Sequence, residues 1–164
     1  MGLKVILITL GFDVDCLLDI CISGPESIQK VNYAHSQGII HNLILTDLQM
    51  PDINGIELTR IFRRMYKNDF NICDRKRQPL IVGVSGHAQS QYEEQGLKAG
   101  MDRFESKPLY ADSLQEILVQ ANISIWIWLG NIGGESFLKK WHLISLCLAG
   151  HREKLVSLIF DLKS

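Results

Sequence analysis

The sequence carries almost no net charge. Its 17 Lys and Arg residues nearly balance its 18 Asp and Glu residues, which leaves a formal net charge of −1 at pH 7. A chain without excess positive charge lacks the global attraction to nucleic acid or to an anionic membrane surface that a basic protein has. The one short basic cluster, residues 74–78, has no interleaved aromatic residues and is typical of a solvated loop. No nucleic-acid partner is therefore expected.

Cysteine and histidine are sparse, and their spacing matches no metal or disulfide motif. The four cysteines are Cys16, Cys21, Cys73 and Cys147. They form neither a Cys-x-x-Cys pair nor a dense disulfide framework, which favours reduced thiols in a cytoplasmic setting. The five histidines are scattered along the chain, with no His-x-x-x-His pair. A zinc site is therefore not expected.

Long hydrophobic runs are also missing. The apolar stretch at residues 5–11 is short and is not followed by a small-residue cleavage site, so it does not resemble a signal peptide. The stretch at 123–134 is apolar, but it is too short and too interrupted by glycine to cross a bilayer. The sequence predicts no membrane span.

From residue 24 onward, buried-strand patterns and amphipathic helical patterns alternate. We expect strands within 42–48, 79–86 and 101–109, and helices within 24–38, 55–66, 89–100 and 110–121. This order predicts an α/β fold with a parallel sheet and right-handed crossovers. The stretch at 3–15 could be a strand, or the end of a helix followed after Gly11 by a short strand, and periodicity does not separate the two.

The character of the chain changes after residue 121. Apolar residues recur at helical spacing through Phe137, Trp141, Ile144 and Leu148, with a break near Gly150. We therefore expect a domain over 1–121 and a helical tail over 122–164, which packs on the domain or on a partner. The tail carries no residue pattern that indicates chemistry.

Three polar residues follow three of the predicted strands. Asp47 comes after "LILT", Ser85 after "IVGV" and Lys107 after "RFES". In parallel α/β sheets the ligand site lies at the carboxyl ends of the strands, so these side chains are expected to meet at one edge. A carboxylate nucleophile, a hydroxyl and an ammonium are the groups needed to receive and hold a phosphoryl group.

The segments "DLQMPDING" (47–55), "VSGHA" (84–88) and "GMDRFESKPL" (100–109) resemble the receiver domain of two-component response regulators and hybrid histidine kinases. The resemblance runs from about Gly11 to Ala121. It implies a flavodoxin-like fold, in which a doubly wound five-stranded parallel sheet carries helices on both faces. It also implies a signalling domain in a phosphorelay rather than an enzyme.

The resemblance implies a role for each strand-end residue. Asp47 would be the phosphoacceptor, which takes the phosphoryl group from the phosphohistidine of a kinase or phosphotransfer domain and becomes 4-aspartylphosphate. Asp47 and the backbone carbonyl of Gln49 would hold Mg²⁺. Ser85 would hydrogen-bond a phosphoryl oxygen, and Lys107 would pair with the new charge.

Further residues match positions that support this chemistry. Phe104 lies where receivers carry the aromatic residue that changes rotamer together with the strand-end serine, although ordinary core packing explains it equally well. Gly86 would leave room beside the acceptor, and Pro51 and Gly55 would shape the turn after it. The bond before Pro108 is cis in this family.

One part of the family pattern is not found. Receivers carry an acidic pair at the end of their first strand, whereas residues 3–15 resemble the end of the first helix and the second strand. The fold is therefore expected to be N-terminally truncated. Asp13 and Asp15 do not replace the pair, because only one predicted helix (24–38) separates them from Asp47, whereas a strand and two helices should separate a first-strand acid from it. Weakened Mg²⁺ binding and exposed strand edges are therefore expected, as is an origin in a larger hybrid kinase.

Two other functions compete with phosphoacceptance. The chain could be a pseudo-receiver or a truncated fragment that acts only as a protein-interaction module, which the missing acids favour. It could also be a phosphatase of the haloacid dehalogenase type, which uses a strand-end Asp nucleophile. That family needs a second Asp two residues further on, and this position is Gln49.

Overall fold

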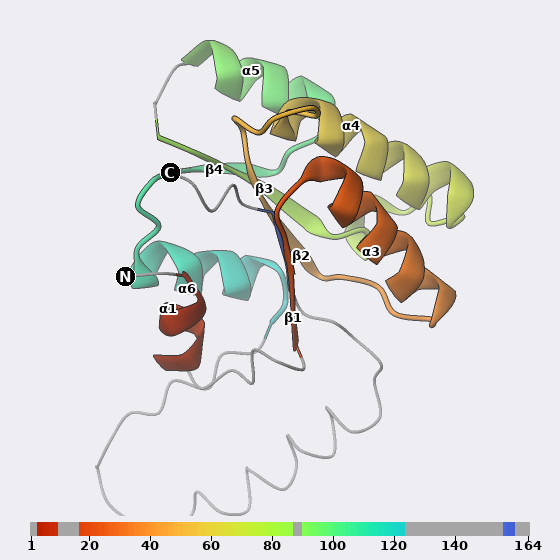
Figure 1. Ribbon diagram of the computed structural model, residues 1–164, viewed down its shortest axis with the longest axis horizontal. Coiled ribbons are helices and arrows are strands. Elements are labelled where there is room, and N and C mark those ends of the chain that lie inside the picture. Colours follow the sequence, from red (N-terminus) through yellow and green to blue (C-terminus); the bar gives the residue numbers. More distant parts are fainter. Residues whose placement is uncertain (1–2, 10–16, 87–89, 124–155, 160–164) are drawn as a thin grey trace, which may run out of the picture.

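The structure is a computed structural model that describes residues 3–9, 17–86, 90–123 and 156–159. A five-stranded sheet lies at its centre, with the strand order β1-β5-β2-β3-β4 (Figure 1). The strands are β1 (Leu18–Cys21), β2 (Leu43–Asp47), β3 (Leu80–Ser85), β4 (Arg103–Ser106) and β5 (Val156–Ile159). Every pairing between neighbouring strands is parallel.

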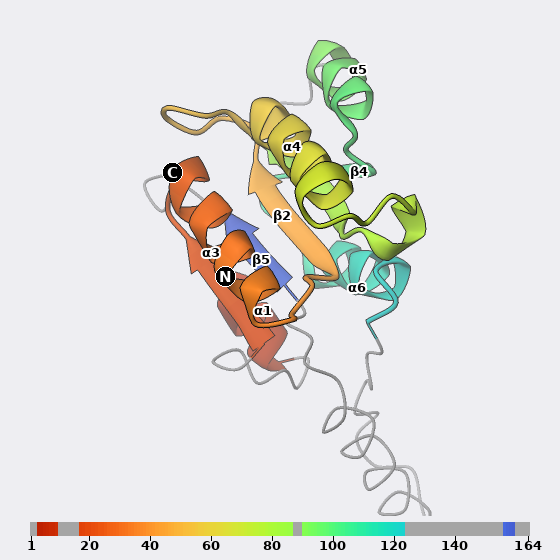
Figure 2. The ribbon, with the colours of Figure 1, turned by 90° about the vertical axis from the view of Figure 1, so that its right-hand side faces the viewer.

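Helices cover both faces of the sheet. They are α1 (Leu3–Thr9), α3 (Gly24–Ser36), α4 (Gly55–Arg64), α5 (Ser90–Ala99) and α6 (Ala111–Gln120). Figures 1 and 2 show α3, α4 and α5 on one face and α1 and α6 on the other. The doubly wound parallel α/β fold predicted from the sequence is confirmed.

The two layers enclose two apolar cores. Leu43 and Leu45 of β2 face the first core, which includes residues of α1 and α6, whereas Ile44 faces the second core under α3 and α4. Successive side chains of a strand point to opposite faces, so β2 supplies both cores. All five β2 residues are buried, which explains the continuous apolar run in the sequence.

The N-terminal region differs in part from the expectation. Residues 3–9 form a helix, the second of the two alternatives. The strand that follows is β1, at 18–21, which lies beyond the stretch 3–15 in which a short strand was expected. Residues 10–16, with Asp13 and Asp15, lie outside the described part of the chain.

The prediction of a helical tail over 122–164 is wrong for the part of the tail that the structure describes. Residues 156–159 form strand β5 rather than a helix, and β5 lies between β1 and β2. The edges expected to be open there are therefore paired with β5. The run "LVSLIF" (155–160) is short and apolar, and such runs fit a buried strand as well as a helix. The remaining tail residues, 124–155 and 160–164, lie outside the described residues.

No helix in the described ranges is long and apolar enough to cross a membrane.

Candidate functional site

Asp47 is the last residue of β2 and is only 3% exposed. Its carboxylate is held by two donors. Oδ2 accepts a hydrogen bond from Nζ of Lys107 at 2.5 Å, and Oδ1 accepts one from the backbone N–H of Gln49 at 3.0 Å. A buried carboxylate is costly unless it is paired and hydrogen-bonded, and here both oxygens have a partner. These two hydrogen bonds therefore hold the carboxylate of Asp47 in place at the strand end.

Ser85 ends β3, the neighbour of β2, and Lys107 follows β4, the neighbour of β3. The backbone N–H of Lys107 donates to the carbonyl of Ser85 at 2.8 Å, and Ser85 is in register with Ser106 of β4. The peptide bond between Lys107 and Pro108 is cis, as the resemblance implies. The structure thus brings the three residues of the predicted site to the carboxyl ends of β2, β3 and β4.

The turn after Asp47 explains the glycine at position 55. The N–H of Gly55 donates to the carbonyl of Leu48 at 3.2 Å, so α4 starts directly against the end of β2. A Cβ atom on Gly55 would lie 2.3 Å from the carbonyl oxygen of Asp47, which is far inside van der Waals contact. Asn54 caps the helix by accepting from the N–H of Glu57 at 2.9 Å. Only glycine fits this junction without displacing the strand end.

Pro51 is exposed in the same loop, where its carbonyl accepts a hydrogen bond from the N–H of Ile53 at 2.8 Å. Asp52 between them has a φ of 66°, which is in the left-handed region. Asp is one of the few residues that adopt this region readily. The loop therefore turns back sharply before α4 begins.

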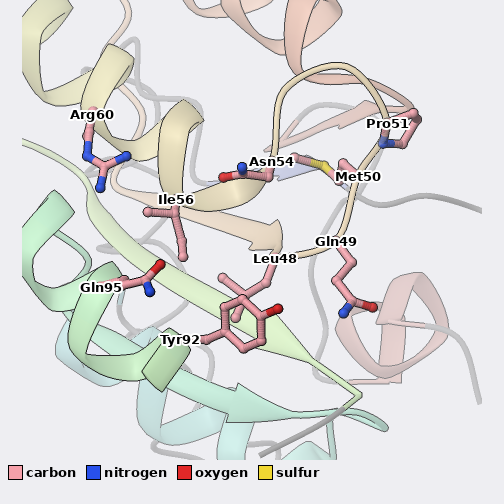
Figure 3. Close-up of a pocket in the computed structure, with 9 residues that line it drawn as sticks. All are labelled: Leu48, Gln49, Met50, Pro51, Asn54, Ile56, Arg60, Tyr92 and Gln95. Carbon is pink, nitrogen blue, oxygen red and sulfur yellow. The ribbon is translucent and has the colours of Figure 1, made fainter. Parts of the chain in front are cut away.

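A cleft of about 550 Å³ lies beside this loop (Figure 3). The loop after β2, the start of α4 and helix α5 surround it. Its lining residues are Leu48, Gln49, Met50, Pro51, Asn54, Ile56, Arg60, Tyr92 and Gln95. The backbone of Gln49 thus lies between the carboxylate of Asp47 and an open, mixed polar and apolar cleft.

Phe104 lies on β4 and is partly buried against the second core. Two glycines make room for its ring, since a Cβ atom on Gly83 or Gly96 would lie 3.1 Å or 2.2 Å from it. The ring therefore packs between β3 and α5, the helix that follows Ser85 in the chain. This placement supports a packing role, and it also lets a movement of α5 act on the ring.

Gly86 follows β3 directly and is exposed. A Cβ atom there would have no heavy atom within 4 Å in the described structure, so the described residues leave space at this backbone position. The next residues of the motif, His87 and Ala88, lie outside the described residues.

The oxygen donors available at this edge suit Mg²⁺ in kind. They are the carboxylate of Asp47 and the backbone carbonyl of Gln49, and Mg²⁺ prefers such hard oxygen ligands together with water. The described ranges contain no group of three or more His, Cys, Asp or Glu side chains that could hold a metal. These oxygen atoms therefore fit Mg²⁺ in kind. Among the described residues, Asp47 supplies the one side-chain carboxylate of this set.

Arg63, near the end of α4, binds the segments that precede β3 and β4, and nothing in the sequence pattern singles it out. Its guanidinium donates to the carboxylate of Asp102 at 2.7 Å and to the carbonyls of Gly100 and Pro79 at 2.9 Å. Asp102 in turn accepts from the N–H of Ile81 at 2.7 Å. Burial lowers the pKa of Arg63 to about 10, against the opposing effect of Asp102. This network ties α4 to the start of β3 and β4.

The family model of the response regulator receiver domain matches residues 3–119. The chain is 34% identical over 111 residues to the sensor protein EvgS of Escherichia coli O157:H7, and 27% identical over 116 residues to hybrid signal transduction histidine kinase I of Dictyostelium discoideum. These matches cover 68% and 71% of the chain but only 8% and 6% of the relatives, so the chain spans less than a tenth of their length.

Solved structures agree in fold. The receiver domain of the histidine kinase CKI1 from Arabidopsis thaliana is 27% identical, with a TM-score of 0.50, and the match covers 63% of this chain and 70% of that one. The receiver domain of the sensor histidine kinase PA1611 from Pseudomonas aeruginosa PAO1, solved with magnesium in its active site cleft, is 22% identical with a TM-score of 0.53. That match covers 74% of this chain and 85% of that one. The chain belongs to the response regulator receiver domain family.

Proposed function

We propose that Asp47 is the phosphoacceptor of this receiver domain and takes a phosphoryl group from a histidine kinase or a histidine phosphotransfer domain. One observation carries the proposal: the nearly buried carboxylate of Asp47 lies 2.5 Å from the ammonium of Lys107, at the strand edge where Ser85 also ends its strand. This arrangement combines a fixed oxygen nucleophile with a cation and a hydroxyl that can hold the transferred group.

The transfer step follows from these positions. A carboxylate oxygen of Asp47 attacks the phosphorus of the phosphohistidine, an acyl phosphate bond forms and the P–N bond breaks. The electron pair of that bond stays on the imidazole nitrogen of the partner. The ammonium of Lys107 then pairs with a phosphoryl oxygen, and the hydroxyl of Ser85 donates a hydrogen bond to another.

Asp47 and the carbonyl of Gln49 would hold Mg²⁺ at this edge. When bound, the ion offsets the repulsion between the carboxylate and the incoming phosphoryl dianion. Because the described residues offer one side-chain carboxylate, we expect Mg²⁺ to bind weakly and mainly through water. Phe104 is proposed to act as a switch together with Ser85. Its ring would change position when Ser85 moves, because it contacts α5, the helix that follows Ser85 in the chain.

The curated relatives are sensor proteins and hybrid histidine kinases many times longer than this chain. The names of these relatives support a role for this chain as one domain of a phosphorelay within a larger signalling protein. The second candidate is a pseudo-receiver that docks partners without being phosphorylated. The single described carboxylate at the strand edge favours this alternative.

Phosphorylation of the unmodified chain and of two variants separates the two candidates. The chain is incubated with Mg²⁺ and a phosphorylated histidine phosphotransfer domain, and the transferred phosphate is measured by mobility shift and mass spectrometry. We expect transfer to the unmodified chain and to Asp52→Asn, the exposed acid five positions on, but none to Asp47→Asn. Folded protein that takes up no phosphate would support the pseudo-receiver, and phosphate on Asp47→Asn would refute the assignment of the acceptor.

A further inference from the structure

Strand β5 occupies a position that its place in the chain does not suggest. It is the last described strand, yet it lies between β1 and β2 in the sheet (Figure 2). All four of its residues are in register with β1, from Val156 opposite Leu18 to Ile159 opposite Cys21. The same four residues are in register with β2, where Ile159 lies opposite Thr46. β5 is therefore paired along its whole length on both sides.

The two neighbours of β5 do not pair with each other. The described sheet joins β1 to the other strands only through β5. Without β5, β1 would lose its only sheet partner. The buried strand β2 would keep β3 but would have an open row of backbone groups on its other side. Buried backbone groups without partners are costly, and an open edge accepts another strand. The gap between β1 and β2 is thus a site shaped for one parallel strand.

The chain connects β5 to the rest of the domain through a long segment. Residues 124–155 separate it from the described end of the α6 region, and a connection of this length can span at most ~110 Å. As a tether, this connection confines β5 to the neighbourhood of the domain, at an effective concentration on the order of millimolar. A limit on reach does not fix the register of β5 in the sheet. Pairing with β1 and β2 must therefore do the positioning, as in the addition of a separate peptide strand to a sheet.

Occupancy of the gap also bears on the proposed acceptor. Thr46, which lies opposite Ile159, directly precedes Asp47. The backbone of β2 at its carboxyl end is thus fixed by β5 on one side and by β3 on the other. Loss of β5 would free one side of the strand that presents Asp47.

We propose that the gap between β1 and β2 is a strand-acceptor site, and that its occupant is the C-terminal segment of this same chain, which binds as a separable internal strand and positions Asp47. The tether supports this occupant, because at micromolar protein its millimolar effective concentration exceeds that of any second copy. Only the last clause, on Asp47, depends on the proposed function.

The test places a proline in β5. In a strand paired on both sides every N–H is used, so Ser157→Pro should remove β5 from the gap, whereas Ser157→Ala should leave it in place. Hydrogen exchange of the full-length variants then reports the amides of β1 and β2. We expect Ser157→Pro to lower their protection by about a hundredfold or more, with β3 and β4 less affected. A synthetic peptide of residues 152–164, added at millimolar concentration, should restore the protection, and a scrambled peptide should not.

Three outcomes would overturn the proposal. Unchanged protection of β1 and β2 in Ser157→Pro would show that β5 does not hold the gap. Loss of protection that the peptide does not restore would show that the strand is not separable. Dimers of the unmodified chain at micromolar concentration that dissociate in Ser157→Pro would show that a second copy is the occupant.

The exchange measurement does not depend on phosphorylation. Asp47→Asn should keep the protection of β1 and β2 at the level of the unmodified chain. If the unmodified chain takes up no phosphate but shows this pattern of protection, the proposed function fails and the strand-acceptor site stands. If phosphate transfer is intact in both the unmodified chain and Ser157→Pro, the positioning of Asp47 by β5 is refuted.

Discussion

Replacement of Gly55 by alanine tests the junction between β2 and α4. The added Cβ would lie 2.3 Å from the carbonyl oxygen of Asp47 and 3.1 Å from the carbonyl carbon. An ordinary contact needs at least 3.4 Å, so the start of α4 must move away from β2 by about 1 Å. Both partners are backbone, and neither can move aside by a change of rotamer.

The expected cost can be estimated from the structure. Overpacking of this kind destabilises a protein by about 1–3 kcal/mol, and displacement of α4 also weakens the hydrogen bond from Gly55 to Leu48. The gain in helix propensity from alanine, about 1 kcal/mol, opposes the loss in part. We therefore expect Gly55→Ala to lower the free energy of unfolding by about 2 kcal/mol, and the melting temperature by about 4–8 °C.

Urea denaturation followed by far-UV circular dichroism measures this loss. Gly86→Ala is the matched control, because a Cβ atom there meets no heavy atom within 4 Å, and its stability should change by less than about 0.5 kcal/mol. Phosphate uptake should fall in Gly55→Ala as well, since the shift moves the backbone of Asp47. Equal stability of the two variants would refute the reasoning, because the close approach at Gly55 would then be absent in solution.

Lys107→Met should destabilise the chain by about 3 kcal/mol, because it leaves the buried carboxylate of Asp47 without its cation. Addition of Asp47→Asn to the Lys107→Met chain should remove most of this loss of stability. A loss that persists in the double variant in urea denaturation would show that the ion pair is not its cause. Gly96→Ala should lower the melting temperature despite the better helix propensity of alanine, because its Cβ would lie 2.2 Å from the ring of Phe104. Addition of Phe104→Leu to the Gly96→Ala chain should restore the melting temperature. A rise in melting temperature on Gly96→Ala would contradict the contact.

The sequence was sufficient to predict most of the architecture between residues 24 and 121. Strand and helix patterns in that region are strongly periodic, because β2 is buried on both faces and the helices have one apolar face. The three strand-end residues Asp47, Ser85 and Lys107 were also predictable, since parallel strands place their carboxyl ends at one edge. These features depend on local order along the chain, which a sequence displays directly.

Other features depend on which distant segments meet. The close approach behind Gly55 and the space that Gly96 leaves for Phe104 are contacts between elements, and a glycine in a sequence does not state what lies beside it. The hydrogen bonds of Arg63 reach residues 37 and 39 positions away. A basic residue on an amphipathic helix gives no sign of such partners.

The position of β5 shows the difference most clearly. Its short apolar run fits a helix or a strand by pattern alone, and the spacing of the tail residues favoured a helix. The segment forms a strand because the backbone groups of β1 and β2 need hydrogen-bond partners, and β5 supplies them on both sides. The sequence by itself determined the alternating elements and the chemistry at the strand ends. Only the tertiary structure decided which strand completes the sheet, since that choice rests on hydrogen bonds between segments more than a hundred residues apart.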